Sequence, residues 1–386
     1  MSPKPHLQPP PRPLRRRTVL AGLAALPAAG LLGTHLSRSR SPHAQAATMP
    51  ITIGYIPIAC ATSLILADAL GTFAAGGLNV RLRKFVGWSE LWSAYVTGDI
   101  DVAHMLSPMP IAIDAGAAGG ARPTRIAATL NTNGQAFVLA AHHHARVRDI
   151  SDLRGFTLGI PFEYSVHALL LRDQLAAAGV DPDLDVSLRL LRPADMVAQL
   201  ATGTIDGFVG PEPLTERALQ QGYGRAFALT KQWWDNHPCC CVAVAKDFAD
   251  AHPGIDDALQ QSLFAAARTT NDAARTAEIA AQENYLNQPA AFVAGALSGT
   301  YTAWDDRVVT DLERMRFDSP TDGAAVTWMA AQLARWNLGI PATTAAVTAA
   351  AEAVLPAGTP TSPALEISGT TFRPTAPLAG YGTGPN

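Results

Sequence analysis

Charge is scarce in this chain. Asp, Glu, Lys and Arg make up 16% of its 386 residues, the formal net charge is −3 at pH 7, and hydrophobic residues make up 48%. Disordered chains show the opposite balance, so the composition predicts a globular protein with a substantial core. Binding to nucleic acid needs a basic face for the phosphates, so we expect no nucleic-acid partner.

Long hydrophobic runs are missing as well. The run from Val19 to Gly33 is too short to span a bilayer comfortably. It follows the pair Arg16-Arg17 and precedes an Ala-Gln-Ala motif at 44–46, which is typical of a signal peptide and its cleavage site. We interpret residues 1–46 as a signal peptide of the twin-arginine type, with a membrane anchor or an ordinary secretory signal as the alternatives. Loss of its seven basic residues changes the net charge from −3 to −10, and we expect the mature protein in the periplasm.

Short β-branched runs alternate with helical patterns along most of the chain, which predicts an α/β protein with a largely parallel sheet. The alternation restarts near residue 150, which indicates two lobes. We assign 50–140 plus 242–340 to a discontinuous first lobe and 141–241 to a second, with an irregular tail at 356–386 that is rich in Pro, Thr, Ser and Gly. Ligands of open α/β sheets bind at the carboxyl ends of strands, so a cleft between the lobes is the expected site.

Four segments carry a resemblance to a known family: 51–80, 192–224, 233–253 and 328–341. The most specific stretch within them reads MVAQLATGTIDGFVGPEP. Together they resemble the periplasmic substrate-binding proteins of ABC importers, in the nitrate/bicarbonate-binding branch of the group that also binds sulfonates, taurine and thiamine precursors. The resemblance implies the type II periplasmic-binding-protein fold, in which two α/β lobes close over a ligand in a hinged cleft.

The same resemblance implies what the protein does. It would deliver a small anion or small organic solute to an ABC permease and its ATPase, as a monomer, without catalysing a reaction and without a cofactor. Two alternatives stay open. One is an enzyme or precursor-binding protein like the thiamine-pyrimidine synthases, which share the fold and carry a cysteine-rich run. The other is an exported sensor that presents its ligand to a membrane regulator. The sequence does not identify the solute.

Candidate ligand-binding residues come from two arguments. Helix N-termini attract oxyanions through free N–H groups and a partial positive charge, and ordinary capping by Ser and Thr is the competing interpretation. This argument selects Thr62, Ser63, Trp88, Ser89 and Ser165. The resemblance implies further positions that face the ligand: His104, Met105, Asn133, Gln135 and His167. It also matches Glu212 to a glutamate beside the cleft, for which we favour a structural role as a hinge or cap contact.

The chain has four cysteines, and three stand in a row at Cys239, Cys240 and Cys241. In the nitrate/bicarbonate-binding branch, a charged side chain reaches the ligand at the positions of the first two. A neutral thiol removes that charge, which argues against a simple nitrate or bicarbonate specificity. We therefore include Cys239 and Cys240 in the candidate ligand-binding set.

Strand alternation predicts that Cys239 and Cys241 face one side and Cys240 the other. We rank a role in the pocket wall first and buried structural thiols second. A disulfide from Cys60 to Cys239 or Cys241 comes third, because connectivity cannot be read from sequence. A metal site comes last, because the run alone does not supply four ligands.

Overall fold

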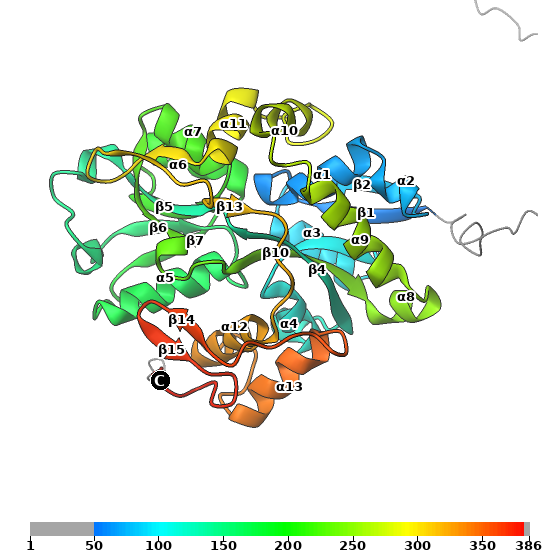
Figure 1. Ribbon diagram of the computed structural model, residues 1–386. Helices are drawn as coiled ribbons and strands as arrows, with labels where there is room; N and C mark the ends of the chain where they lie inside the picture. The colour runs from blue at the N-terminus through cyan, green and yellow to red at the C-terminus, as the bar shows by residue number, and fades with distance from the viewer. Residues whose placement is uncertain (1–49, 382–386) are drawn as a thin grey trace, which may run out of the picture. The chain divides into compact units, whose positions relative to one another are not determined.

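The computed structural model describes residues 50–381, so the expected signal peptide lies outside the described residues. Two sheets organise the described chain (Figure 1). The first has the strand order β13-β4-β10-β3-β1-β2 and the second β7-β6-β8-β5-β9. The first sheet contains β1 (Ile51–Tyr55), β2 (Val80–Lys84), β3 (Val102–Leu106), β4 (Thr124–Asn133), β10 (Pro238–Ala245) and β13 (Met315–Arg316). The second contains β5 (Gln135–Ala140), β6 (Thr157–Ile160), β7 (Ser187–Leu190), β8 (Gly207–Pro211) and β9 (Gly224–Leu229).

Helices cover both sheets. Those that accompany the first half of the chain are α1 (Thr62–Ala69), α2 (Thr72–Ala75), α3 (Trp88–Val96), α4 (Met109–Asp114), α5 (Val166–Ala177), α6 (Pro193–Ala201) and α7 (Leu214–Gln220). Those that follow are α8 (Lys246–Ala251), α9 (Ile255–Ala267), α10 (Ala273–Ala280), α11 (Ala290–Ser298), α12 (Gly323–Arg335) and α13 (Thr344–Val354). Among the described residues, none of these helices has the length and hydrophobicity to span a bilayer.

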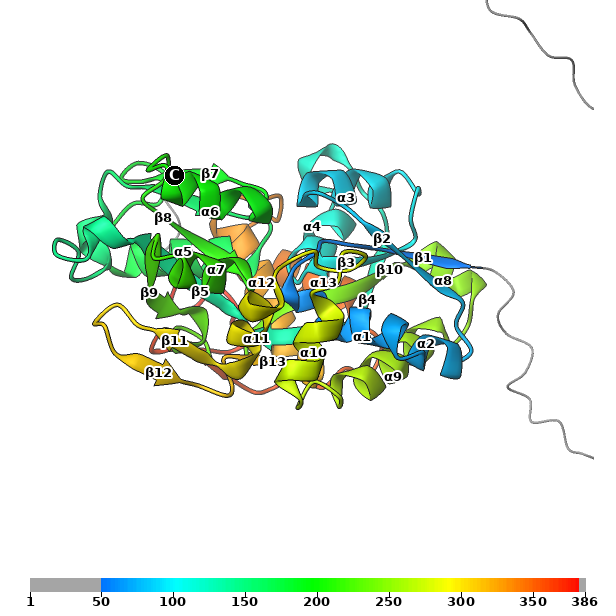
Figure 2. The same ribbon diagram turned by 90° about the horizontal axis from the view of Figure 1, so that it is seen from above.

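Two short hairpins complete the fold. The first is β11 (Thr300–Thr302) with β12 (Val308–Thr310), and the second is β14 (Leu365–Ile367) with β15 (Thr370–Phe372). Figure 2 shows the first hairpin beside β9, in agreement with a bridge between Ala226 and Ala303. The second lies next to α12 in Figure 1. It falls in the expected irregular tail, whose other residues up to 381 form no further strand or helix.

The prediction of a largely parallel sheet was wrong, because both sheets are mixed. Strands β1, β2 and β3 run parallel, but β10 is antiparallel to β3 and to β4. In the second sheet β6 is parallel to β7 and β8, whereas β5 is antiparallel to β8 and β9. The reversed strands are β5, β10 and the short β13. Through β5 and β10 the chain enters one sheet directly after leaving the other.

The chain changes sheets at two connections. The first is a single residue, Gly134, between β4 and β5. Its φ of 86° lies in the left-handed region, and a Cβ there would collide with the Met315 side chain. Its amide donates to Arg314 O at 2.8 Å and its carbonyl accepts from Glu212 N at 3.3 Å. The second connection leads from Leu229 to Pro238. The lobe boundaries expected at 140/141 and 241/242 stay a prediction.

A buried ionic cluster lies beside the first connection. The guanidinium of Arg314 is paired with Glu212 and, at 2.9 Å, with Glu216, and all three side chains are buried. Glu212 also accepts a hydrogen bond from Glu216 N, and its carbonyl accepts one from Ala59 N at 2.7 Å. Glu212 is therefore a structural residue between the sheets, as we favoured from the sequence.

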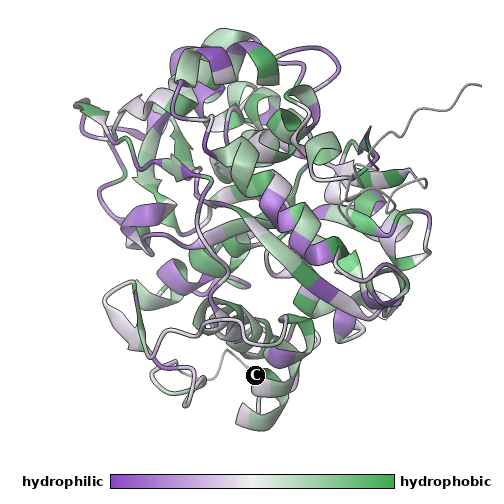
Figure 3. Ribbon diagram, turned by 45° about the vertical axis from the view of Figure 1, so that its right-hand side comes forward, coloured by the Kyte–Doolittle hydropathy of each residue, from purple (hydrophilic) through white to green (hydrophobic). Residues whose placement is uncertain are grey.

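The core extends through both sheets. Hydrophobic residues concentrate in the central strands and in α12, and hydrophilic residues lie mainly in outer loops and helix surfaces (Figure 3). Helix α12 is buried along nearly its whole length. An ion pair between Arg335 at its end and Asp173 (2.6 Å) joins α12 to α5, which packs against β8 of the second sheet.

Candidate functional site

Three cysteines meet at the end of the first sheet where β10 begins. Cys60 lies in a short 3₁₀ turn, Ala59–Ala61, that leads from β1 into α1, and Cys239 and Cys240 lie in β10. The Cys239 sulfur is 3.5 Å from that of Cys60 and 3.6 Å from that of Cys240. All three side chains are fully buried and their sulfurs lie within 4.8 Å of one another. We call these residues the thiol cluster.

The prediction from strand alternation was wrong for the first two cysteines of the run. Cys239 and Cys240 do not face opposite sides, because the β10–β4 register shifts between Pro238 and Cys240 and again before Cys241. Such an irregularity re-aims side chains at the end of a strand. Cys241 instead pairs with Met105 of β3. All four cysteines are free thiols, so the structure brings Cys60 to Cys239 without bonding the two.

Three histidines surround the thiol cluster. They come from separate elements: His104 lies in β3, His167 in the first turn of α5, and His237 directly before the first residue of β10. Each is fully buried and interacts electrostatically with Cys239. Within the described part of the chain, neither ring nitrogen of His104 or of His167 has a hydrogen-bond partner. Buried polar atoms without partners are uncommon in native proteins, so these rings indicate a place where something polar binds.

Burial keeps the three imidazoles neutral. It lowers the pKa of His104 and of His237 to about 4, and it lowers the pKa of His167 in the same direction. The removal of the charged form from water is the largest cause in each case. The histidines therefore offer the site hydrogen-bond donors and lone pairs, but no formal positive charge at neutral pH.

The thiols divide into two kinds. Burial raises the pKa of Cys60 and of Cys240 well above the ordinary value. Burial acts on Cys239 as well, but hydrogen bonds from Cys240 and Cys60 stabilise its thiolate and hold its pKa well below the ordinary value. Of the three thiols, Cys239 is therefore the one that most readily becomes a thiolate.

Aromatic side chains join α3 to the loop between β6 and α5. Trp92 of α3 stacks on Tyr164 at 5.1 Å between ring centroids and contacts Phe162 at 5.8 Å. The tyrosine and phenylalanine lie in the loop between β6 and α5. Next to it, Trp88 packs edge-on against His104 at 5.4 Å. Its indole nitrogen is buried and has no partner among the described residues.

The predicted site residues fall into two groups. Trp88, His104, His167, Cys239 and Cys240 come together around the thiol cluster. The other seven have different surroundings: Thr62, Ser63, Ser89, Met105, Asn133, Gln135 and Ser165.

Two of the predicted hydroxyl residues act within their own helix ends. Ser165 caps α5: its Oγ accepts from Ala168 N at 3.0 Å and donates to Phe162 O at 2.6 Å. The hydroxyl of Thr62 donates to Ala59 O at 2.6 Å. For these two, ordinary helix-end hydrogen bonding accounts for the side chain.

The remaining predicted residues lie near the site or away from it. Ser63 is buried, with a long contact of 3.5 Å from its hydroxyl to Leu130 O. Ser89 is exposed. Met105 pairs with Cys241, and because successive strand residues alternate, it lies on the face of the first sheet opposite His104.

Asn133 and Gln135 flank Gly134, the first connection between the sheets, and their side chains form hydrogen bonds there. The Gln135 amide donates to Asn133 O at 2.9 Å and accepts from Thr230 at 3.1 Å. Asn133 Nδ2 donates to Glu313 O at 3.0 Å. His237 Nε2 lies 2.9 Å from the Thr230 hydroxyl. Sequence reasoning missed His237, although its position two residues before Cys239 was a usable signal.

The buried histidines predict a loss of stability in mild acid. The unfolded chain takes up a proton at each imidazole near pH 6.5, whereas the folded chain resists it until about pH 4. Because the pKa of each histidine is lower in the folded state, the buried imidazoles cost no stability above pH 6.5. The free energy of unfolding falls as the pH drops from 6.5 toward 4. A shift of this size corresponds to about 3 kcal/mol for each of His104 and His237.

Urea unfolding between pH 4.5 and 7 measures this dependence. H104Q should flatten the slope, while H142Q, at an exposed histidine, should leave it unchanged. Equal slopes for the wild type and H104Q would contradict the assignment of a buried neutral His104.

Comparisons with known proteins find a matching family model and several relatives. A family model described as the NMT1-like family matches residues 44–283. The bicarbonate transport ATP-binding protein CmpC of Synechococcus elongatus is 32% identical over 310 residues, which are 74% of this chain and 45% of that protein. The chain therefore spans about half the length of this relative. The nitrate/nitrite binding protein NrtA of the same organism is 31% identical over 325 residues, covering 76% of this chain and 73% of NrtA.

A solved structure confirms the fold. The periplasmic nitrate-binding protein NrtA from Synechocystis superposes with a TM-score of 0.80 and 24% identity, covering 86% of this chain and 97% of that one. The expected type II periplasmic-binding-protein fold with two α/β lobes is confirmed, as is the resemblance to the nitrate/bicarbonate-binding branch.

Proposed function

The chain belongs to the NMT1-like family, and on this premise we propose that it is the solute-binding protein of an ABC importer. It binds one small solute between its lobes in the periplasm, catalyses no reaction, and passes the solute as a monomer to a permease driven by an ATPase. Relatives named for the ATP-binding part of bicarbonate and nitrate import support this assignment of partners.

One observation carries the proposal: buried polar atoms of Trp88, His104 and His167 have no hydrogen-bond partner among the described residues. Each unsatisfied buried group costs about 1–3 kcal/mol. A polar solute that accepts from the indole and exchanges hydrogen bonds with the imidazoles removes this cost. The three residues come from α3, β3 and α5, so the same solute would contact elements of both lobes.

The electrostatics of the site restrict the solute. Its imidazoles are neutral at pH 7, and Cys239 and Cys240 stand where relatives of the nitrate/bicarbonate branch are expected to carry a charged side chain. The solute is then either a weakly charged or delocalised anion, such as nitrate, bicarbonate or a sulfonate, or a small polar organic molecule. Hydrogen bonding and aromatic contact provide its affinity.

Calorimetric titration and thermal unfolding of residues 47–386 test the function. The panel contains nitrate, nitrite, bicarbonate, taurine and short alkanesulfonates, together with native mass spectrometry of any solute that co-purifies. At a concentration 100 times Kd, the solute should stabilise the protein by about 2.7 kcal/mol.

Chemical conversion of the bound solute, detected by NMR of the mixture, would contradict a pure binding role. Unimpaired uptake in a strain that lacks the protein but keeps the permease would favour a sensor.

Cys239→Lys should raise the affinity for nitrate. A hydrogen bond to a charged group contributes about 1.5–3 kcal/mol, which corresponds to a gain of roughly 10–100-fold over a neutral side chain. Cys239→Met is the matched control, because it adds length without charge. Calorimetry that gives the same nitrate Kd for both variants would show that position 239 does not face the solute.

A further inference from the structure

We propose that Cys60, Cys239 and Cys240 form a binding site for a soft, thiophilic metal cation of the Zn²⁺ and Cd²⁺ class. The inference goes beyond the proposed function, because such a site is present whether or not the protein serves an importer. The earlier ranking of a metal last considered the cysteine run alone, and the fold adds Cys60 from a segment 179 residues away.

The spacing of the sulfurs carries the proposal. Zn–S bonds of ~2.3 Å at tetrahedral angles separate two sulfurs by about 3.8 Å. The two measured separations are 3.5 and 3.6 Å, and the third stays within 4.8 Å. Three thiols are therefore already grouped at the spacing that a cation would impose. Their backbone positions need little movement, because Cys239 and Cys240 are held in β10 between β3 and β4.

A second observation points to a further ligand. His167 is fully buried, and both of its ring nitrogens lack a partner among the described residues. It stands in the first turn of α5, which packs against β10. A neutral imidazole is a good ligand for zinc, and three thiolates with one imidazole form a common structural zinc set.

The chemistry of binding balances simply. Binding of a divalent cation to the three sulfurs as thiolates forms three metal–sulfur bonds and releases to solvent the protons that the thiols carried, with no change of oxidation state. Three thiolates and one divalent cation leave a net charge of −1 at the occupied site. The affinity should therefore rise with pH.

A disulfide is the competing use of the same thiols. A bond between Cys60 and Cys239 would need the sulfurs to approach from 3.5 Å to about 2.05 Å. It would leave Cys240 outside the bond. A cation uses all three thiols, which favours metal binding over oxidation.

The test uses fully reduced, metal-free protein spanning 47–386. Cd²⁺ is titrated while thiolate-to-metal charge-transfer absorbance is followed, and Zn²⁺ affinity is measured against a chelating indicator. We expect one cation per chain, and a loss of at least about 100-fold in affinity for C60S, C239S or C240S. C241S is the matched control: Cys241 is buried in the same strand but outside the thiol cluster, and C241S should bind as the wild type does.

A second measurement keeps the test independent of folding defects. In the wild type, Zn²⁺ should protect three of the four cysteines from alkylation under mild denaturation, with Cys241 modified first. Absence of stoichiometric binding by the reduced protein, equal loss in C241S, or a Cys60–Cys239 disulfide that persists under mild reduction would overturn the proposal. Solute titrations of the metal-free wild type are run in parallel, so failure of the metal site and failure of solute binding are seen separately.

Discussion

Replacing Arg314 by methionine is expected to lower the free energy of unfolding by about 3–5 kcal/mol. The guanidinium is buried with Glu212 and Glu216, and its side chain is only 1% exposed. Without it, two carboxylates remain close together in the interior. Burial raises the pKa of Glu216 even with the arginine present, so in the variant Glu216 would take up a proton rather than stay charged.

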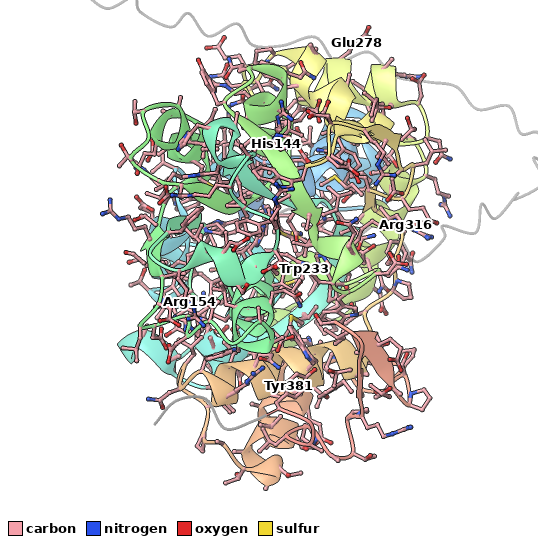
Figure 4. The ribbon with its side chains drawn as sticks, turned by 90° about the vertical axis from the view of Figure 1, so that its left-hand side faces the viewer. His144, Arg154, Trp233, Glu278, Arg316 and Tyr381 are labelled. Carbon is pink, nitrogen blue, oxygen red and sulfur yellow. The ribbon has the colours of Figure 1, made fainter. Side chains whose placement is uncertain are left out.

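Arg316 provides the control for this prediction. It lies two residues away and pairs with Glu313 at 3.1 Å, but its side chain is 38% exposed (Figure 4). R316M should change stability by no more than about 0.5 kcal/mol, because exposed ion pairs contribute little. Adding E212Q and E216Q to R314M should recover part of the loss. Urea unfolding that ranks R314M and R316M equally would contradict a structural role for the ionic cluster.

Trp328→Ala is expected to cost about 3–5 kcal/mol, as for other large aromatic residues in a core. The indole is fully buried in α12. It packs against Trp234 at 4.8 Å between ring centroids and donates to the Tyr381 hydroxyl at 2.8 Å; Tyr381 lies beside α12 in Figure 4. Trp234 belongs to the connection that leads into His237, so loosening it should weaken solute binding too.

Two measurements separate packing from the hydrogen bond. Trp328→Phe keeps an aromatic ring but loses the donor, and should cost about 1–2 kcal/mol. Calorimetry with the solute identified for the wild type should show weaker binding for Trp328→Ala than for Trp328→Phe. An alanine variant as stable as the phenylalanine variant would mean that the core closes around the missing ring.

The sequence predicts the class of the fold well, because strands and helices leave local patterns. Helix α5 is an example: Ser165 marks its start as a capping residue, and the Leu and Ala pattern runs to its end. The direction of β5 and β10 leaves no such pattern. It depends on where the chain crosses between sheets, and the left-handed turn at Asn133 and Gly134 does not identify that crossing from the sequence.

The site is predictable only in part, for a similar reason. Trp88, His104 and His167 could be proposed one at a time, but their common location depends on contacts between distant segments. The irregularity in β10 that turns Cys239 and Cys240 to the same region is set by pairing with β4. No rule applied to the cysteine run alone predicts it.

The thiol cluster lies on the first sheet, whereas His167 is in the first turn of α5, which packs against β8 of the second sheet. If the proposed hinge separates the two sheets, we expect the three sulfurs to stay together and the imidazole to move away with α5. A solute or ion would then meet the sulfurs first and the ring afterwards. We therefore expect uptake in two stages, a rapid docking followed by a slower engulfment, with the residence time governed by how often the second stage reverses.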